Sequence, residues 1–242
     1  MLSLDTISVS LRQGFRMKKK TILHEISLTI EPGQVYSFLW LNGAGKTTII
    51  KTIMGLIKPT QGSVSLFGKP KTTNHSIGYA ADESNLYPQL TAQDHIRLIW
   101  SLLWLPEATI QSTWQLLLSQ LQLTWTQHMY VQNFSHGMKK RLQLLLSLLA
   151  DPDIIIRDEP TNGLDPQGNI LVKQLITTLQ SQNKTLLLST HNLQDIEQLA
   201  SHYAILHHWR IIDQWPLTAK QKPLETYFFE KVNHNNTRVS QN

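Results

Sequence analysis

The sequence predicts an α/β fold with a mainly parallel sheet, an antiparallel β region at its N-terminus and a helical insertion. Short apolar stretches alternate with helical ones, which is typical of parallel sheets. A glycine-rich loop at 43–47 separates a strand-like stretch from a helical one. Residues 85–150 are mostly helical in character and rich in Leu, Gln and Trp. We expect one domain over 1–230, followed by a polar tail at 231–242.

The N-terminal third has the alternation and the β-branched residues of strands. Strands are expected at 6–12, 25–30, 34–40, 62–68 and 76–80. Pro32-Gly33 marks a turn between the second and third of these strands. Residues 46–57 have helical periodicity, which ends before Pro59.

After the insertion, the sequence again alternates between strand-like and helical segments. A short apolar run at 153–156 is typical of a buried parallel strand. The following elements are expected to be a helix at 169–180, a strand at 184–190, a helix at 192–200 and a hairpin at 203–213. The tail from Lys231 is polar, so we expect it to be frayed.

Composition narrows the classes of protein. Hydrophobic residues make up 41% of the 242 residues, as in a globular chain. The absence of cysteine excludes disulfides and thiolate metal sites. The apolar stretches 96–105 and 142–150 fall short of the ~20 residues that span a bilayer, so we interpret both as core helices. The first 15 residues lack the pattern of a signal peptide.

The net charge of +5 leaves two interpretations open. A basic protein can bind nucleic acid or an anionic membrane surface. The densest basic run, 16–20, has no nucleic-acid motif around it. A solvated loop is the favoured interpretation of that run, and no nucleic acid is expected as a partner.

Gly43-Ala44-Gly45-Lys46-Thr47 has the pattern and the strand-to-helix context of a phosphate-binding loop. Glycines let backbone N–H groups surround phosphate oxygens at a helix N-terminus. Lys46 would reach the β- and γ-phosphates, and the Thr47 hydroxyl would bind Mg²⁺. The pattern also asks for glycine at position 40, where the chain has Trp40. The alternative is a glycine-rich turn without a ligand.

A second group of polar residues ends the apolar strand in "IIIRDEPTNGLDP", 154–166. Asp158 is placed to hold Mg²⁺, directly or through water. Glu159 could orient or deprotonate an attacking water. The alternative, two surface acids at a strand end, loses weight because the phosphate loop is present in the same chain.

These motifs resemble those of the ATP-binding subunits of ABC transporters, and the resemblance extends over nearly the whole chain. "LNGAGKTT" is similar to the Walker A motif, and 154–166 to the Walker B motif and D-loop. "FSHGMKKRL" (134–142) resembles the signature motif, and "LLLSTHNLQDIEQLA" (186–200) the switch-histidine segment. "IGYAADESNLYPQLTAQDHI" (77–96) resembles the Q-loop and the entry to the helical subdomain. The resemblance implies a P-loop NTPase core.

The resemblance also implies a role for each matching residue. Glu159 and His191 would be the catalytic residues, and Thr47, Asp82 and Asp158 would bind Mg²⁺. The ATP-binding residues would be Trp40, Leu41, Asn42, Gly43, Ala44, Gly45, Lys46, Thr47 and Thr48. Ser135, His136, Gly137 and Met138 would cap the nucleotide of the opposite protomer, and Asp165 would line the interface. ATP and Mg²⁺ are the implied cofactors.

The same resemblance implies the partners of the protein and its localisation. A second ATP-binding domain, from a homodimer or a paralogue, would complete a head-to-tail sandwich. A separate transmembrane permease subunit would hold the chain at the cytoplasmic face of the membrane. The segments near 86–95 and 134–142 look most like exporters of the drug, lantibiotic or bacteriocin-immunity type. One alternative is a degenerate subunit that binds ATP and dimerises with little hydrolysis; another is the ABC proteins of translation or DNA repair.

Several positions depart from the family pattern. Trp40 replaces the first Walker A glycine, and Leu41 stands where proline is frequent. Asp82 replaces Gln or Glu, Arg157 interrupts an apolar run, and His136 stands at a variable position that is often glycine. At the adenine-stacking position the chain has Met17, with Phe15 nearby. Three further tryptophans occupy expected glycine positions: Trp104, Trp209 and Trp215.

The expected costs of these departures are considerable. A left-handed residue at the His208-Trp209 turn would cost ~1–2 kcal/mol, and overpacking at Trp40 about 1–3 kcal/mol. A buried, unpaired Arg157 would cost several kcal/mol more. Three explanations stay open: the side chains are accommodated, the protein is a drifted copy, or it is a specialised subunit that couples weakly.

Overall fold

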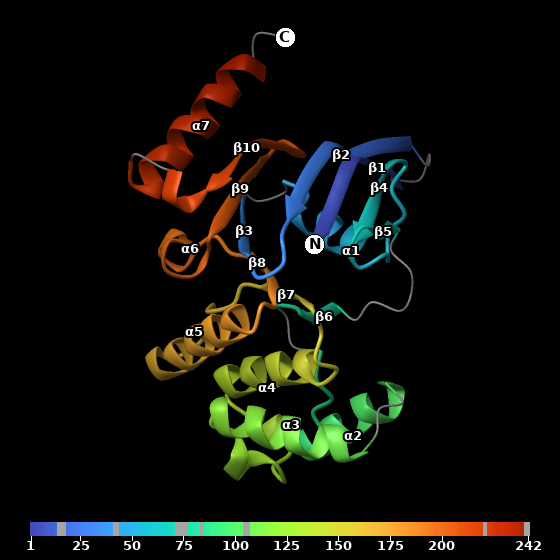
Figure 1. Ribbon diagram of the computed structural model, residues 1–242, viewed down its shortest axis with the longest axis vertical. Helices are drawn as coiled ribbons and strands as arrows, with labels where there is room; N and C mark the ends of the chain where they lie inside the picture. Colours follow the sequence, from blue (N-terminus) through green and yellow to red (C-terminus); the bar gives the residue numbers. More distant parts are fainter. Residues whose placement is uncertain are drawn as a thin grey trace. The chain divides into compact units, whose positions relative to one another are not determined.

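The computed structural model describes residues 1–13, 18–40, 44–70, 77–82, 85–103, 107–219 and 222–239. The chain forms two compact units, each described below by itself (Figure 1). Unit 1 comprises Met1–His75 and Leu187–Asn242, and unit 2 comprises Ser76–Leu186. The sequence places a helical insertion at about 85–150. Unit 2 is larger, because it also includes a strand before the insertion and a strand and a helix after it.

Unit 1 begins with an antiparallel sheet, as the sequence predicts. Its strands lie in the order β2-β1-β4-β5. They are β1 (Leu2–Gln13), β2 (Lys18–Ile30), β4 (Gln61–Leu66) and β5 (Lys69–Pro70). β1 pairs antiparallel with both neighbours, β2 and β4.

β-Bulges keep one face of the two long strands apolar. In β1 the buried residues Leu4 and Ile7 are three positions apart instead of two. The register shifts between them, where Thr6 has φ 46°. An extra residue turns the following side chains back to the same face, so Ile7 stays buried like Leu4. In β2, Glu25 has φ 49° and separates the buried Leu23 and Ile26 in the same way.

A second set of strands in unit 1 carries the phosphate loop. β3 (Val35–Trp40) is buried along its whole length and pairs parallel with β9 (His202–His207). β9 pairs antiparallel with β10 (Arg210–Pro216), which confirms the predicted hairpin. The helix α1 (Lys46–Ile53) follows β3 and turns Ile49, Ile50 and Ile53 inward. The short 3₁₀ helix η3 (Leu217–Ala219) follows β10.

Residues 224–239 form a helix, which corrects the predicted fraying from Lys231 for the described part of the tail. α7 (Leu224–Val239) packs with α6 (Leu193–Leu199) and β10. Phe228 and Val232 join a buried cluster with Leu39 of β3 and Ile205 of β9. The apolar residues at 224, 228 and 232 recur every four positions, so they form one face of a helix that the many polar residues around them obscure.

Unit 2 contains a parallel strand pair and four helices. β6 (Ile77–Ala80) pairs parallel with β7 (Ile154–Asp158). The helices are α2 (Ala92–Leu103), α3 (Glu107–Gln120), α4 (His136–Leu148) and α5 (Pro166–Ser181), with 3₁₀ turns η1 (Thr124–Thr126) and η2 (Val131–Asn133). α4 packs against β6, β7 and the other three helices (Figure 1). β8 (Thr185–Ser189) contains the division between the units.

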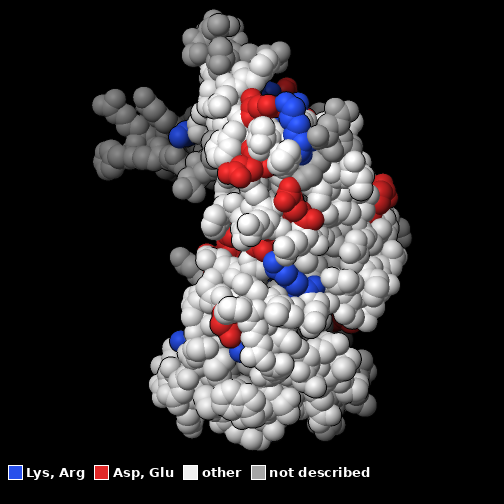
Figure 2. Space-filling view, turned by 90° about the vertical axis from the view of Figure 1, so that its left-hand side faces the viewer, with Lys and Arg blue, Asp and Glu red and all other residues white. Residues whose placement is uncertain are grey.

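These parallel and antiparallel pairings confirm the predicted α/β class. Among the described residues, no helix is long and apolar enough to cross a membrane. On the face drawn in Figure 2, acidic and basic side chains are interspersed with uncharged ones.

Candidate functional site

The described end of the predicted phosphate loop, Ala44 and Gly45, leads directly into α1 in unit 1. Gly45 caps α1 in the left-handed region, with φ 102°. A Cβ at this position would lie 2.8 Å from Leu23 Cδ2 and 3.1 Å from the Ile22 carbonyl oxygen. Glycine is therefore needed here both for its conformation and for the close approach of β2. Lys46 and Thr47 follow as the first residues of α1.

Six of the predicted ATP-binding residues lie in the described part of the chain. They are Trp40, Ala44, Gly45, Lys46, Thr47 and Thr48. The other three, Leu41, Asn42 and Gly43, lie outside it, as do Met17 and Phe15, the residues considered for adenine stacking, and Trp104.

Trp40 contacts the lysine of the same loop. Its side chain is buried at the end of β3, with 8% exposed. The Lys46 ammonium lies 4.2 Å from the centroid of the indole ring. This is a cation–π contact, worth up to about 2 kcal/mol where water is excluded. The residue that departs from the Walker A pattern therefore interacts directly with the main cation of that motif.

His191 lies in unit 1, in the turn between β8 and α6. Its side chain is exposed. The turn is fixed on both sides of it, because Asn192 N–H donates to Thr190 Oγ1 at 3.0 Å and Gln194 N–H donates to Asn192 Oδ1 at 3.0 Å. Asn192 is thus the N-cap of α6, and the cap holds His191 just before that helix.

Asp158 and Glu159 lie in unit 2, at the end of β7. Glu159 is 7% exposed and has φ 49°. A left-handed backbone costs a residue with a Cβ ~1–2 kcal/mol. Strain of this kind concentrates at functional sites, where the surrounding structure holds it. The predicted catalytic acid is therefore both buried and strained.

The signature residues and Asp165 come together within unit 2. Ser135 is the N-cap of α4 and accepts from Met138 N–H at 3.2 Å. Asp165 is the N-cap of α5 and accepts from Gly168 N–H at 3.2 Å. A Cβ on Gly137 would lie 3.7 Å from Asp165 Oδ1. The two capped helix starts are therefore neighbours.

His136 adds a contact that the sequence did not reveal. A Cβ on Gly163, which has φ 71°, would lie 2.5 Å from His136 Cδ2. Gly163 is therefore needed both for its conformation and to make room for the imidazole. The substituted signature position fits because its neighbour in the D-loop is a glycine.

Asp82 pairs with a residue that the sequence analysis did not single out. Lys140 of α4 donates from Nζ to Asp82 Oδ1, and Asn162 Nδ2 donates to the same oxygen at 3.5 Å. The Lys140 side chain is 1% exposed and that of Asp82 is 37% exposed. Lys140, Leu144 and Leu148 are four positions apart on one helix face, a spacing that could have indicated the burial of this lysine.

Arg157 is buried in β7, with 1% exposed. Among the described residues, no hydrogen-bond acceptor contacts its Nε or either terminal nitrogen. Burial lowers the pKa of Arg157 to about 10, while the nearby Asp82, Asp158 and Tyr79 act in the opposite direction. The Arg157 guanidinium, which the sequence analysis expected to be costly if buried, therefore lies inside the protein.

The other tryptophans at expected glycine positions are placed differently. At the β9–β10 turn His208 has φ 43° and Trp209 has φ 64°, so the predicted left-handed strain is confirmed. Trp209 lies next to Gly45 and under the Lys20 ammonium, 5.1 Å from the ring centroid. Trp215 is 56% exposed and donates from Nε1 to Asp213 Oδ1 at 2.9 Å, so solvent accommodates it.

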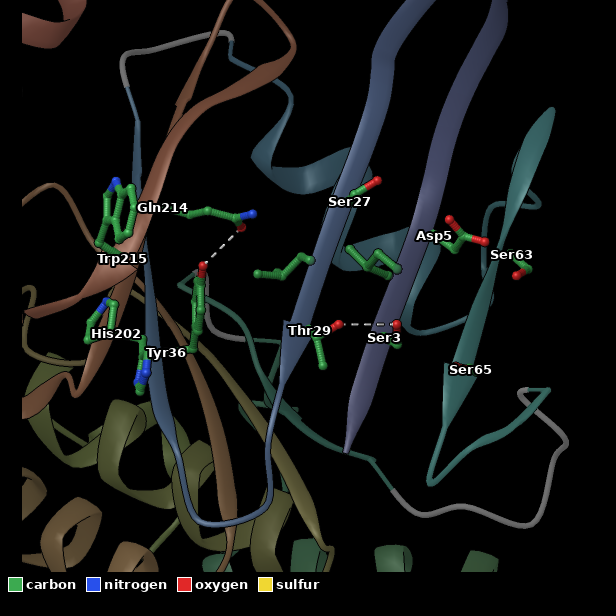
Figure 3. A pocket seen from close by; sticks show the side chains of 13 residues that line it. Ser3, Asp5, Ser27, Thr29, Tyr36, Ser63, Ser65, His202, Gln214 and Trp215 are labelled. Atoms are coloured by element: carbon green, nitrogen blue, oxygen red, sulfur yellow. Dashed lines mark hydrogen bonds between the residues drawn. The ribbon is translucent and has the colours of Figure 1, made fainter.

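A groove of about 740 Å³ lies in unit 1 (Figure 3). Hydroxyl groups of the antiparallel sheet line one side, among them Ser3 and Thr29, whose oxygens are 3.4 Å apart. Tyr36 lines the other side and donates to Gln214 Oε1 at 3.4 Å. Burial raises the pKa of Tyr36, so its hydroxyl stays protonated. Among the residues that the structure describes, none of the predicted site residues lines this groove.

The α/β fold and the glycine that caps α1 after β3 agree with a phosphate-loop nucleotide-binding protein. Residues 23–162 match the ABC transporter family. Since this match covers more than half of the chain, the protein belongs to that family, as an ATP-binding domain.

Relatives and solved structures agree with this assignment. The lantibiotic transport ATP-binding protein SrtF of Streptococcus pyogenes is 36% identical over 196 residues, which cover 80% of this chain and 84% of that protein. The bacitracin transport ATP-binding protein BcrA of Bacillus licheniformis is 33% identical over 230 residues, 91% of this chain and 73% of that protein. A solved ATP-binding subunit of an ABC transporter superimposes with a TM-score of 0.84 at 27% identity, covering 96% of this chain and 99% of that one.

Proposed function

We propose that this protein hydrolyses ATP to drive an ABC exporter. The observation that carries the proposal is Glu159, a buried acid in a strained backbone directly after the Asp158 that ends β7. A carboxylate held in this way can accept a proton from an attacking water. The start of α1 supports the same function, because Gly45 caps it in a left-handed backbone and Lys46 and Thr47 follow at the N-terminal end of the helix, which favours an anion.

The residues present fit ATP and Mg²⁺ by their chemistry. Lys46 would bind the β- and γ-phosphates, and backbone N–H groups at the start of α1 would receive the phosphate oxygens. The Thr47 hydroxyl and the Asp158 carboxylate are the hard oxygen ligands that Mg²⁺ prefers. When bound, Mg²⁺ would neutralise charge on the phosphates. His191 would contact the γ-phosphate.

The assembly follows from family membership. Ser135, His136, Gly137 and Met138 would cap ATP bound to a second ATP-binding domain, with Asp165 at the interface. The positive end of α4 starts at these residues and favours an anion. A transmembrane permease subunit would carry the cargo and hold the chain at the cytoplasmic face of the membrane. SrtF and BcrA are named for lantibiotic and bacitracin transport, so we propose export of an antimicrobial peptide.

Glu159→Gln tests hydrolysis against mere binding. The variant keeps the shape of the side chain but cannot act as a base, so ATP turnover should fall by about 10²–10⁴-fold. Retained ATP should also shift the variant to a dimer, measured by gel filtration with bound-nucleotide analysis.

Asp153→Asn is the matched control, because this acid lies just before β7 with its side chain 68% exposed. It should turn over ATP at the normal rate. The degenerate alternative predicts no measurable turnover in the unmodified protein and no gain in nucleotide retention from Glu159→Gln.

A further inference from the structure

Two buried cations in the described part of unit 2 lie near one acid, Asp82. Lys140 of α4 and Arg157 of β7 are each 1% exposed. Moving a charge out of water is costly unless an opposite charge and hydrogen bonds compensate for it. Asp82 accepts from Lys140 Nζ and lies close enough to Arg157 to favour its charged form. Asp158 is the other carboxylate near Arg157.

The topology brings these charges together from three segments. Ala80 at the end of β6 is the register partner of Arg157 in β7, and Asp82 follows two residues later. On the other side, β6 approaches α4 closely, because a Cβ on Gly78 would lie 2.3 Å from the Ser147 carbonyl oxygen. Asp82 thus lies within reach of both the helix and the strand.

We propose that Asp82 is a positioning residue whose carboxylate, bonded to the buried Lys140 and close to Arg157, anchors the segment after β6 to the signature helix α4 beside the Walker B strand β7. This role differs from that of a Mg²⁺ ligand, which the resemblance implies for position 82. The carboxylate already binds an ammonium group, and two neighbouring positive charges repel a further cation. The inference rests on the proposed function only where ATP turnover is read.

The neutral variant Asp82→Asn tests the anchor through stability. It takes the carboxylate away from Lys140 and leaves Arg157 with one carboxylate fewer, so the melting temperature should fall by about 10 °C. Lys140→Gln leaves Asp82 with Arg157 and should lower it by about half as much. Asp82→Glu keeps the charge and should melt close to the unmodified protein. The triple variant Asp82→Asn, Lys140→Gln, Arg157→Leu removes all three charges and should recover the lost melting temperature.

The Asp151–Lys184 pair is the matched control within the same unit. Its atoms are 2.7 Å apart, but the Asp151 side chain is 83% exposed. An ion pair with an exposed carboxylate contributes little, so Asp151→Asn should shift the melting temperature by less than about 3 °C.

The Mg²⁺ requirement separates positioning from metal binding. If Asp82 is a positioning residue, Asp82→Asn lowers kcat, while the Mg²⁺ concentration for half-maximal ATP turnover stays within about threefold of that of the unmodified protein. Loss of a metal ligand, or of a group bonded to one, raises that concentration by about tenfold or more. Such a rise overturns the inference, as does an Asp82→Asn variant that melts like the unmodified protein. If the unmodified protein lacks turnover, the proposed function fails, while the melting data still decide the anchor.

Discussion

Trp40 presents its indole face to Lys46 at 4.2 Å, although the phosphate-loop pattern asks for glycine at this position. The ring attracts the same ammonium group that ATP phosphates would attract. Replacing Trp40 with glycine removes this competing attraction, worth up to about 2 kcal/mol. We expect Trp40→Gly to lower the KM for ATP by about three- to tenfold, measured by steady-state turnover.

Trp40→Phe is the control, because a smaller ring keeps part of the attraction. Its KM should lie between those of the unmodified protein and Trp40→Gly. Melting curves are needed for both variants, since each also reduces the apolar volume at the end of β3. A higher KM for a well-folded Trp40→Gly variant would show that the indole assists ATP binding.

At the scale of elements, the start of α4 depends on the loop before α5. Gly163 has φ 71° and faces His136, so Gly163→Ala combines a left-handed alanine with a clash at 2.5 Å. We expect it to lower the free energy of unfolding by about 2–3 kcal/mol, of which ~1–2 kcal/mol is backbone strain. Denaturant unfolding measures this loss.

Gly68 provides a matched comparison. It has φ 73°, and nothing lies within 4 Å of a Cβ placed there. Gly68→Ala should therefore show the backbone strain alone. Combining His136→Ala with Gly163→Ala removes the clash, so the loss in that double variant should fall toward the strain alone. Equal losses for Gly163→Ala and Gly68→Ala would mean that the imidazole moves aside freely.

Local patterns predicted the elements well, because they are properties of neighbouring residues. Strand alternation, helical periodicity and the short apolar run at 153–156 placed β3, α1, β7 and the β9–β10 hairpin correctly. α7 was missed because Leu224, Phe228 and Val232 are few among polar residues and are buried only through contact with distant strands. The β-bulges at Thr6 and Glu25 were also missed, since they show in the sequence only as a break of alternation.

The sequence named the residues of the candidate site, but it could not give their contacts. Motif spacing gave Lys46, Asp158 and Glu159. The partners of the unusual residues come from other elements: Lys140 reaches Asp82 from α4, and Lys46 reaches Trp40 from α1. Such pairs depend on tertiary packing. Departures from a family pattern therefore have to be judged in the structure, where Trp40, Asp82 and His136 prove to have specific neighbours.

At the scale of the whole molecule, ligand binding should increase the free energy of unfolding. A ligand that binds only the folded protein at about 100 times its Kd contributes about 2.7 kcal/mol. For a chain of this size that corresponds to a rise in melting temperature of about 5–11 °C. We therefore expect ATP with Mg²⁺ to raise the melting temperature of the full chain by this amount, measured by calorimetry.

Two variants in α1 make this measurement specific. Lys46→Ala should abolish the shift, while Lys51→Ala, an exposed lysine in the last turn of the same helix, should keep it. A shift in the unmodified protein means that the loop binds nucleotide despite Trp40, whether or not hydrolysis follows. A shift that appears only in Trp40→Gly would instead mean that the indole blocks the loop. The proposed motor function would then be lost at the binding step, before Glu159 could act.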